Sequence, residues 1–233
     1  MPRLLSNLAD VTDADSLANR LRARRFERFE HLSRALPRPL RIIDLGGTAE
    51  FWRQRGWADR DGVRITLVNL QTETTDLPHN VRAIQGDVTN LRHLPNDAFD
   101  VAFSNSVIEH LFTWEGQQRM AAEIKRLAPA YWIQTPNFWF PMEPHFLVPG
   151  WQWLPIAARV AVLRCVRCGS RGPCGSKREA SQAVREIRLL RKRELRTLFP
   201  VATIEPERFG GIVKSWIVHH GFHADVHQRR QAA

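Results

Sequence analysis

The sequence predicts an α/β fold with a mostly parallel sheet of seven strands that ends in a C-terminal antiparallel hairpin. Short apolar runs alternate along the chain with longer segments in which apolar residues recur at helical spacing. Several of the runs end in glycine or small polar residues, which is typical of buried strands in a parallel sheet. Because crossovers between parallel strands are right-handed, we expect a doubly wound, Rossmann-like arrangement with helices on both faces.

The expected elements follow in chain order. A helix is predicted over 14–36, where Pro37 ends the helical spacing of apolar residues. Strands are predicted at 40–47, 64–70, 81–84, 99–103 and 131–134, with helices at 49–57 and 115–127. A single strongly basic helix is predicted over 178–199. Two last strands, 201–208 and 212–218, are joined by Gly210-Gly211, which is typical of a hairpin.

We expect three parts along the chain: an N-terminal helical segment (1–39), a main domain (40–222) and a polar tail (223–233). The main domain contains an insertion at about 137–177 that is rich in aromatic residues, proline and cysteine. With 43% hydrophobic and 25% charged residues, the composition is globular and excludes a disordered or fibrous chain. The sequence has no uninterrupted stretch of about 20 apolar residues, and its start lacks the apolar core of a secretory signal. We therefore expect a cytoplasmic protein.

The net charge of +10 lies in the last third of the chain. Residues 151–233 hold 16 basic and 6 acidic side chains, whereas 1–150 hold 18 of each. A basic segment of this kind is suited to contact with RNA or with an anionic membrane surface. The alternative is an ordinary solvated surface in an arginine-rich protein, since only 4 of the 34 basic residues are lysine.

Small or polar residues stand at the end of five predicted strands, where ligands bind in open parallel sheets. They are Asp44 to Thr48, Asn69 to Gln71, Gly86 to Val88, Ser104 to Ser106 and Thr135 to Asn137. The first of these loops is neither Gly-x-Gly-x-x-Gly nor a Walker loop, and a carboxylate before its glycines would repel phosphate and attract a cation. The sequence therefore indicates a nucleoside ligand with a positive centre, and S-adenosylmethionine has this chemistry.

The order of these motifs resembles that of class I S-adenosylmethionine-dependent methyltransferases, of the type 11/23-like group. The motifs that carry the resemblance are IIDLGG (42–47), FDVAFSNSVIEHL (99–111) and YWIQTPNFWFP (131–141). It implies that Asp44 and Gly46 face the methionine part of the cofactor, that Asp87 accepts from the adenine amino group, and that Asn105 lies near the methionine part. Asn69 stands where the family has an acidic residue for the ribose hydroxyls. The expected cofactor residues are Asp44, Gly46, Gly47, Asn69, Leu70, Asp87, Val88 and Asn105.

Two histidines are candidates for a general base, which a hydroxyl or amine acceptor needs. His110 follows the fourth predicted strand and His145 lies beyond the fifth. The alternatives are a helix-start residue for His110 and a packing role in the loop for His145. Some ubiquinone-pathway O-methyltransferases, which this region resembles, bind a metal through two acids and a histidine. Here Ser106 takes the place of the first acid and leaves Glu109 and His110, so no metal site is predicted.

The aromatic segment and the cysteines leave alternatives open. Eight aromatic residues fall within 131–153, and they could pack a helix layer, line an acceptor pocket or contact an anionic membrane. Cys165, Cys168 and Cys174 are spaced as in part of a zinc knuckle, but a fourth ligand is missing nearby. We expect reduced thiols at the surface of a cytoplasmic loop.

The function predicted from the sequence is methyl transfer from S-adenosylmethionine to oxygen, nitrogen or carbon of a small or lipid-like acceptor. One alternative is an RNA methyltransferase that uses the basic helix 178–196. Another is a domain that binds S-adenosylmethionine without catalysis.

Overall fold

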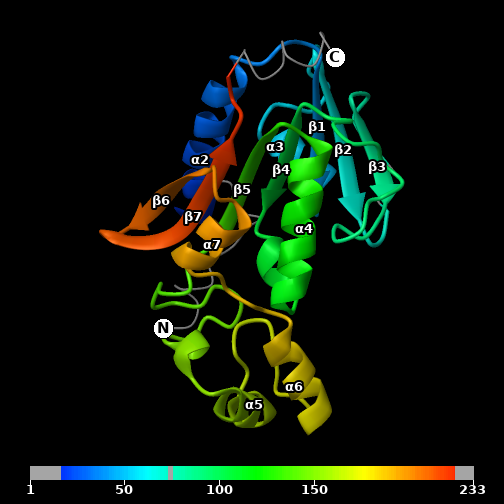
Figure 1. The fold of residues 1–233 in the computed structure, drawn as a ribbon. Helices are drawn as coiled ribbons and strands as arrows, with labels where there is room; N and C mark the ends of the chain where they lie inside the picture. The colour runs from blue at the N-terminus through cyan, green and yellow to red at the C-terminus, as the bar shows by residue number, and fades with distance from the viewer. Residues whose placement is uncertain (1–16, 73–75, 224–233) are drawn as a thin grey trace.

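A computed structural model of the chain describes residues 17–72 and 76–223. Its sheet has seven strands in the order β3-β2-β1-β4-β5-β7-β6 (Figure 1). In chain order the strands are β1 (Leu40–Leu45), β2 (Val63–Asn69), β3 (Val81–Gln85), β4 (Val101–Asn105), β5 (Ala130–Pro136), β6 (Thr203–Phe209) and β7 (Ile212–His220). The first five are parallel, whereas β7 runs antiparallel to both β5 and β6. The predicted α/β sheet and its C-terminal hairpin are confirmed.

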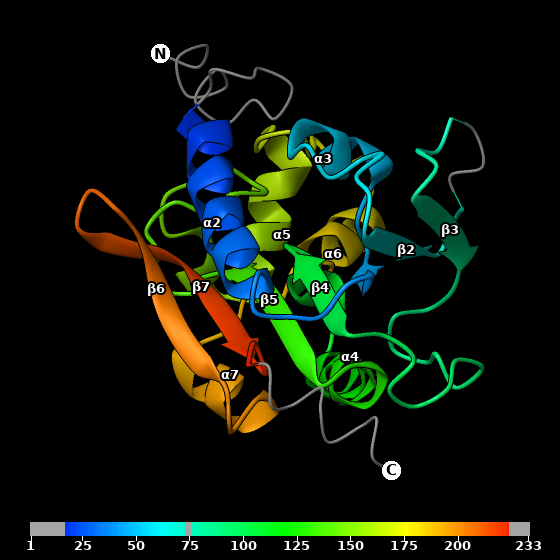
Figure 2. The same ribbon diagram turned by 90° about the horizontal axis from the view of Figure 1, so that it is seen from above.

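Helices cover both faces of this sheet. The helices of the described residues are α2 (Leu17–Ser33), α3 (Ala49–Gln54), α4 (Trp114–Leu127), α5 (Ile156–Cys165), α6 (Lys177–Arg185) and α7 (Lys192–Leu198), with short 3₁₀ turns η1 (Ile108–His110) and η2 (Trp151–Trp153). In Figure 2, α2 and α3 lie on one face of the sheet, and α4 and α7 lie on the other. The start of the predicted first helix (14–16) and the tail 224–233 lie outside the described residues. Within the described residues, no helix has the length and apolarity to cross a bilayer.

Two apolar clusters hold the layers together, one on each face of the sheet. Successive side chains of a strand point to opposite faces of the sheet. In β1, Ile43 therefore packs in the cluster on the α4 side (the α4 cluster), and Ile42 packs in the cluster on the α2 side (the α2 cluster). The first cluster packs α4 and α7 onto the sheet. The second contains several aromatic side chains, and Phe29 of α2 contacts the rings of Trp57, Phe103 and Trp132.

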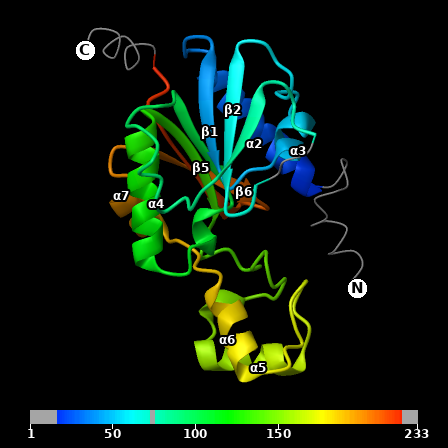
Figure 3. The same cartoon turned by 90° about the vertical axis from the view of Figure 1, so that its right-hand side faces the viewer.

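A third apolar cluster forms a lobe beyond the carboxyl ends of the parallel strands, where α5 and α6 lie in Figures 1 and 3. Its core holds the stacked rings of Phe146 and Trp151, whose centroids are 4.5 Å apart. Cys168 and Cys174 are buried in the same cluster, and only Cys165 is exposed. The prediction of surface thiols is therefore wrong for two of the three, because the lobe uses them as small apolar side chains. Burial also raises the pKa of both buried thiols.

The prediction of one continuous helix over 178–199 is wrong. The structure breaks it into α6 and α7, and the chain between them is extended along the carboxyl edge of the sheet. There Arg188 N donates to Glu109 O at 2.7 Å, and Leu190 O accepts from Phe138 N at 3.2 Å. Leu189 packs in the lobe, whereas Leu190 packs in the α4 cluster. Burial of adjacent leucines in two separate cores outweighs the helical propensity of the sequence. Contact of this region with RNA or a membrane stays a prediction.

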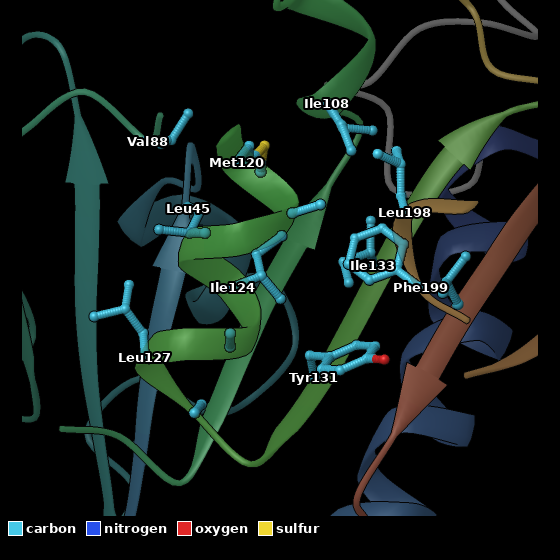
Figure 4. Packing of buried hydrophobic residues seen from close by; sticks show 14 of the residues in the cluster. Leu45, Val88, Ile108, Met120, Ile124, Leu127, Tyr131, Ile133, Leu198 and Phe199 are labelled. Atoms are coloured by element: carbon cyan, nitrogen blue, oxygen red, sulfur yellow. The ribbon is translucent and has the colours of Figure 1, made fainter. Parts of the chain in front are cut away.

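Figure 4 shows how the α4 face of the sheet is filled. Met120, Ile124 and Leu127 of α4 point toward the strands, where Tyr131 and Ile133 of β5 lie. Leu198 and Phe199, at the end of α7, complete the cluster beside β5. This packing fixes the strand ends from which the site residues project.

Candidate functional site

The turn after β1 places a buried carboxyl beside two glycines. Gly46 has a φ of +83°, and an added Cβ there would lie 2.6 Å from Val107 Cγ2. At Gly47 an added Cβ would lie 1.7 Å from Asp44 Oδ2. Only glycine therefore lets this turn pass over the Asp44 carboxyl and below the loop after β4. Thr48 then starts α3 by accepting a hydrogen bond from Phe51 N.

Only one of the two Asp44 carboxyl oxygens accepts a hydrogen bond from the described residues. Its Oδ2 accepts from Trp52 Nε1 at 2.8 Å, while Oδ1 has no hydrogen-bond partner among the described residues. Burial raises the pKa of Asp44 to about 7, and the Trp52 hydrogen bond opposes this shift. A positively charged donor at Oδ1 would satisfy that oxygen and favour the ionised form.

The ends of β2 and β3 carry the next predicted residues. Asn69 Nδ2 donates to Gly47 O at 2.8 Å, so it braces the glycine turn. Leu70 is 71% exposed and offers an apolar surface beyond the strand. Asp87 is exposed, and its Oδ1 accepts from both N and Oγ1 of Thr89. The side chain of Val88 packs in the α4 cluster, which leaves only its backbone for a ligand.

Asn105, at the end of β4, is held by a residue that the sequence analysis did not identify. Its Oδ1 accepts from Arg25 Nη1 of α2 at 2.6 Å. Arg25 also donates to Glu207 of β6 at 2.8 and 3.0 Å, and both side chains of this ion pair are almost fully buried. No local pattern marks Arg25 among the many arginines of its helix, since the contact joins residues 182 positions apart.

The two candidate histidines come together beyond the ends of β4 and β5. The rings of His110 and His145 lie edge to face with centroids 4.8 Å apart. His145 Nδ1 is 2.7 Å from Glu143 Oε1, and Glu143 also accepts from the backbone N of His145 and Phe146. Glu143 is 1% exposed and was missed in the sequence analysis, although the spacing Glu143-x-His145 signals a local pair. A carboxylate in this position fixes the imidazole and leaves its other nitrogen free to act.

Burial changes the acid–base character of two neighbouring groups. It lowers the pKa of His110 to about 4, with further contributions from His145 and Arg171. It raises the pKa of Glu109 to about 7. Glu109 Oε2 accepts from Thr135 Oγ1 at 3.0 Å, and Oε1 has no hydrogen-bond partner among the described residues. Near neutral pH, His110 is uncharged.

Glu109, His110 and His145 also form a set of metal-type ligands. Their ligand atoms all lie within 4.8 Å of one another. Two nitrogens and one carboxylate oxygen could hold a transition-metal ion. Sequence spacing brings together only Glu109 and His110, because the third ligand, His145, comes from the loop after β5.

Part of this chain is similar in sequence to known proteins. Residues 45–129 match the family profile described as a methyltransferase domain. An uncharacterized protein of Mycobacterium tuberculosis strain H37Rv is 36% identical over 62 residues. That match covers 27% of this chain and only 21% of the relative.

A solved methyltransferase structure has a similar fold. The CurJ carbon methyltransferase superposes with a TM-score of 0.55 at 10% identity, over 91% of this chain and 58% of that one. An S-adenosylmethionine-dependent methyltransferase from Aquifex aeolicus covers 94% of this chain and 97% of its own, with 13% identity and a TM-score of 0.47.

Proposed function

We propose that this chain, a class I S-adenosylmethionine-dependent methyltransferase by its fold and its central domain, moves a methyl group to oxygen, nitrogen or carbon of a small or lipid-like acceptor. One observation carries the proposal. Asp44, near the end of β1, is a buried carboxyl with one oxygen that has no hydrogen-bond partner among the described residues, and the His145–Glu143 pair lies beyond the same edge of the sheet. The first suits a cationic cofactor and the second suits proton removal from an acceptor.

The described residues fit the cofactor. Asp44 has a free oxygen for a cationic group, and the glycine turn leaves the backbone bare of side chains at Gly46 and Gly47. The residues that would hold S-adenosylmethionine are Asp44, Gly46, Gly47, Asn69, Leu70, Asp87, Asn105 and the backbone of Val88. When bound, the cofactor supplies a methyl group on a positively charged sulfur, which is already activated for transfer.

His145 is the better candidate for the base. Glu143 fixes its Nδ1, so Nε2 can take a proton from the acceptor while Glu143 stabilises the imidazolium that forms. His110 has a pKa of about 4 and is therefore a poor proton acceptor near neutral pH. Its edge-to-face contact with His145 suits a role in shaping the site.

The test is calorimetric titration with S-adenosylhomocysteine, the product of the cofactor. We expect binding to the wild type, weaker binding to Asp87→Ala, and unchanged binding to Asp61→Ala, an exposed carboxyl at the opposite edge of the sheet. Absence of binding to the wild type would contradict the proposed function. Equal affinity of Asp87→Ala and the wild type would contradict only the placement of the adenine.

A further inference from the structure

A cavity of about 230 Å³ lies between the loop after β5, α5 and the chain that joins α6 to α7. The rings of Phe146 and Trp151 form part of its wall, together with Ile187 and Leu189. Glu143 belongs to the same wall and also holds His145, so the cavity opens beside the proposed base. Its size is below the roughly 300–1,000 Å³ of pockets for drug-sized ligands, which favours a small molecule.

Three buried polar atoms on residues of this wall lack a hydrogen-bond partner within the described part of the chain. They are Trp151 Nε1, Gln152 Oε1 and Arg159 Nε. Gln152 is held in place because its Nε2 donates to Phe138 O at 3.0 Å and to Phe140 O at 2.6 Å, which leaves Oε1 as the free end. Buried polar groups are normally paired, so these atoms call for a ligand that accepts two hydrogen bonds and donates one.

The charges on the wall favour an anion. The wall contains three arginines and two glutamates (Arg159, Arg188, Arg191, Glu143 and Glu194), so it carries one formal positive charge in excess. Arg188 donates to Glu194 Oε1 at 2.6 Å, and these two charges balance each other.

The other two arginines are available to a ligand. Arg191 lies over the ring of Phe138, 4.4 Å from its centroid. Burial lowers the pKa of Arg159, while nearby Glu143 acts in the opposite direction, and Glu143 already accepts three hydrogen bonds from His145 and Phe146. An anionic ligand group would add counter-charge beside these two guanidinium groups, which share the wall with Glu143.

We propose that this cavity binds a small carboxylic acid that carries a hydroxyl group and an apolar body. The carboxylate accepts from Arg159 and Trp151, the hydroxyl donates to Gln152, and the apolar body packs against the aromatic wall. The two unpartnered donors match the two oxygens of a carboxylate. That this acid is the methyl acceptor rests on the proposed function, but its binding does not.

The probe is 3-phenyllactate, titrated into the full chain and followed by ligand-observed NMR and calorimetry without cofactor. Matched compounds isolate each group: 3-phenyllactamide lacks the charge of phenyllactate and 3-phenylpropionate lacks its hydroxyl. Phenethyl phosphate, which also lacks the hydroxyl, carries a phosphate in place of the carboxylate of 3-phenylpropionate. We expect phenyllactate to bind best and the amide to bind about tenfold or more weakly, because charge-assisted hydrogen bonds are the strong ones.

Variants test the residues. Arg159→Gln should lower the affinity for phenyllactate about tenfold and leave the affinity for the amide nearly unchanged. Arg164 is an exposed arginine on the same helix, and Arg164→Gln should change neither of these affinities. Unchanged binding of S-adenosylhomocysteine and unchanged melting temperature would show that the variants fold.

Several outcomes would overturn the inference: equal affinities for the acid and the amide, tighter binding of the phosphate, full affinity in Arg159→Gln, or no binding at millimolar concentration. None of these would affect S-adenosylhomocysteine binding, so a failure here is distinguishable from a failure of the proposed function.

Discussion

Asp44 and Glu109 are fully buried carboxyls near the carboxyl edge of the sheet, and each has one oxygen without a hydrogen-bond partner among the described residues. Neither is placed where folding alone benefits, because a buried carboxyl costs free energy unless it is paired or protonated. Burial raises the pKa of both to about 7, so each can change charge near neutral pH. Perturbed groups of this kind cluster at functional sites.

The pKa of Asp44 gives a pH dependence for cofactor binding. A cationic amino group binds the ionised carboxyl, and with a pKa of about 7 most Asp44 is protonated at pH 6. The affinity for S-adenosylhomocysteine should therefore rise about tenfold between roughly pH 6 and pH 8. Calorimetry at both pH values measures this. Asp44→Asn should bind weakly with little pH dependence, and a wild-type affinity that falls over this range would contradict the assignment.

The two histidines are expected to differ in their effect on turnover. His145→Gln should lower kcat by about 10²- to 10⁴-fold with an acceptor that the wild type methylates, because it removes the proton acceptor held by Glu143. His110→Gln should have a much smaller effect, since His110 has a pKa of about 4. Rates measured at saturating cofactor test both.

Two controls separate a base from other roles. Both histidine variants should bind S-adenosylhomocysteine like the wild type, because neither residue is expected to contact it. Dialysis against a chelator should leave the wild-type rate unchanged. Loss of activity on chelation, with recovery on addition of metal, would instead favour a metal ion held by Glu109, His110 and His145.

At the scale of elements, the N-terminal helix α2 is tied to the far end of the chain. Arg25 joins β4 and β6 through Asn105 and Glu207, whereas Arg28, one turn later, makes only a partly exposed pair with Glu205 at 3.1 Å. The two arginines differ in burial rather than in chemistry. The structure therefore offers a matched pair for measuring how α2 is attached.

Removal of the buried arginine should be costly. Arg25→Met leaves the Glu207 carboxylate buried without its partner and should lower the free energy of unfolding by about 3–5 kcal/mol. Arg28→Met should lower it by about 1 kcal/mol or less, because exposed ion pairs contribute little. Urea denaturation of the three proteins measures the difference. Equal losses in the two variants would show that the buried pair does not anchor α2.

For the molecule as a whole, the buried carboxyls predict a stability optimum at weakly acidic pH. The pKa values of Asp44 and Glu109 are about 7 when folded and near 4 when unfolded, so the folded state binds more protons between these values and stability falls as pH rises. Glu205 and Glu207 have lowered pKa values, so their contribution to the stability of the folded state is lost only as the pH falls below about 4.5.

The melting temperature measured without cofactor should therefore be highest at about pH 5 and decline toward pH 8. In the double variant Asp44→Asn, Glu109→Gln, most of this decline in melting temperature should be absent. A wild-type melting temperature that increases steadily from pH 5 to pH 8 would contradict the raised pKa values.

The sequence by itself determined the sheet, its hairpin and the strand ends that carry Asp44, Asn69 and Asp87. These follow from local patterns: the alternation of apolar and polar residues along a strand, and glycine where the chain must turn. The family resemblance followed from the same short motifs.

Only the tertiary structure decided the rest. It broke the basic helix between α6 and α7, because Leu189 and Leu190 are buried in different cores. It brought His145 and Glu143 to His110 and Glu109, and it set Arg25 against Glu207 across the chain. Burial, ion pairing and cavity walls depend on residues far apart in sequence, and no local pattern records which distant side chains will exclude water from a given group.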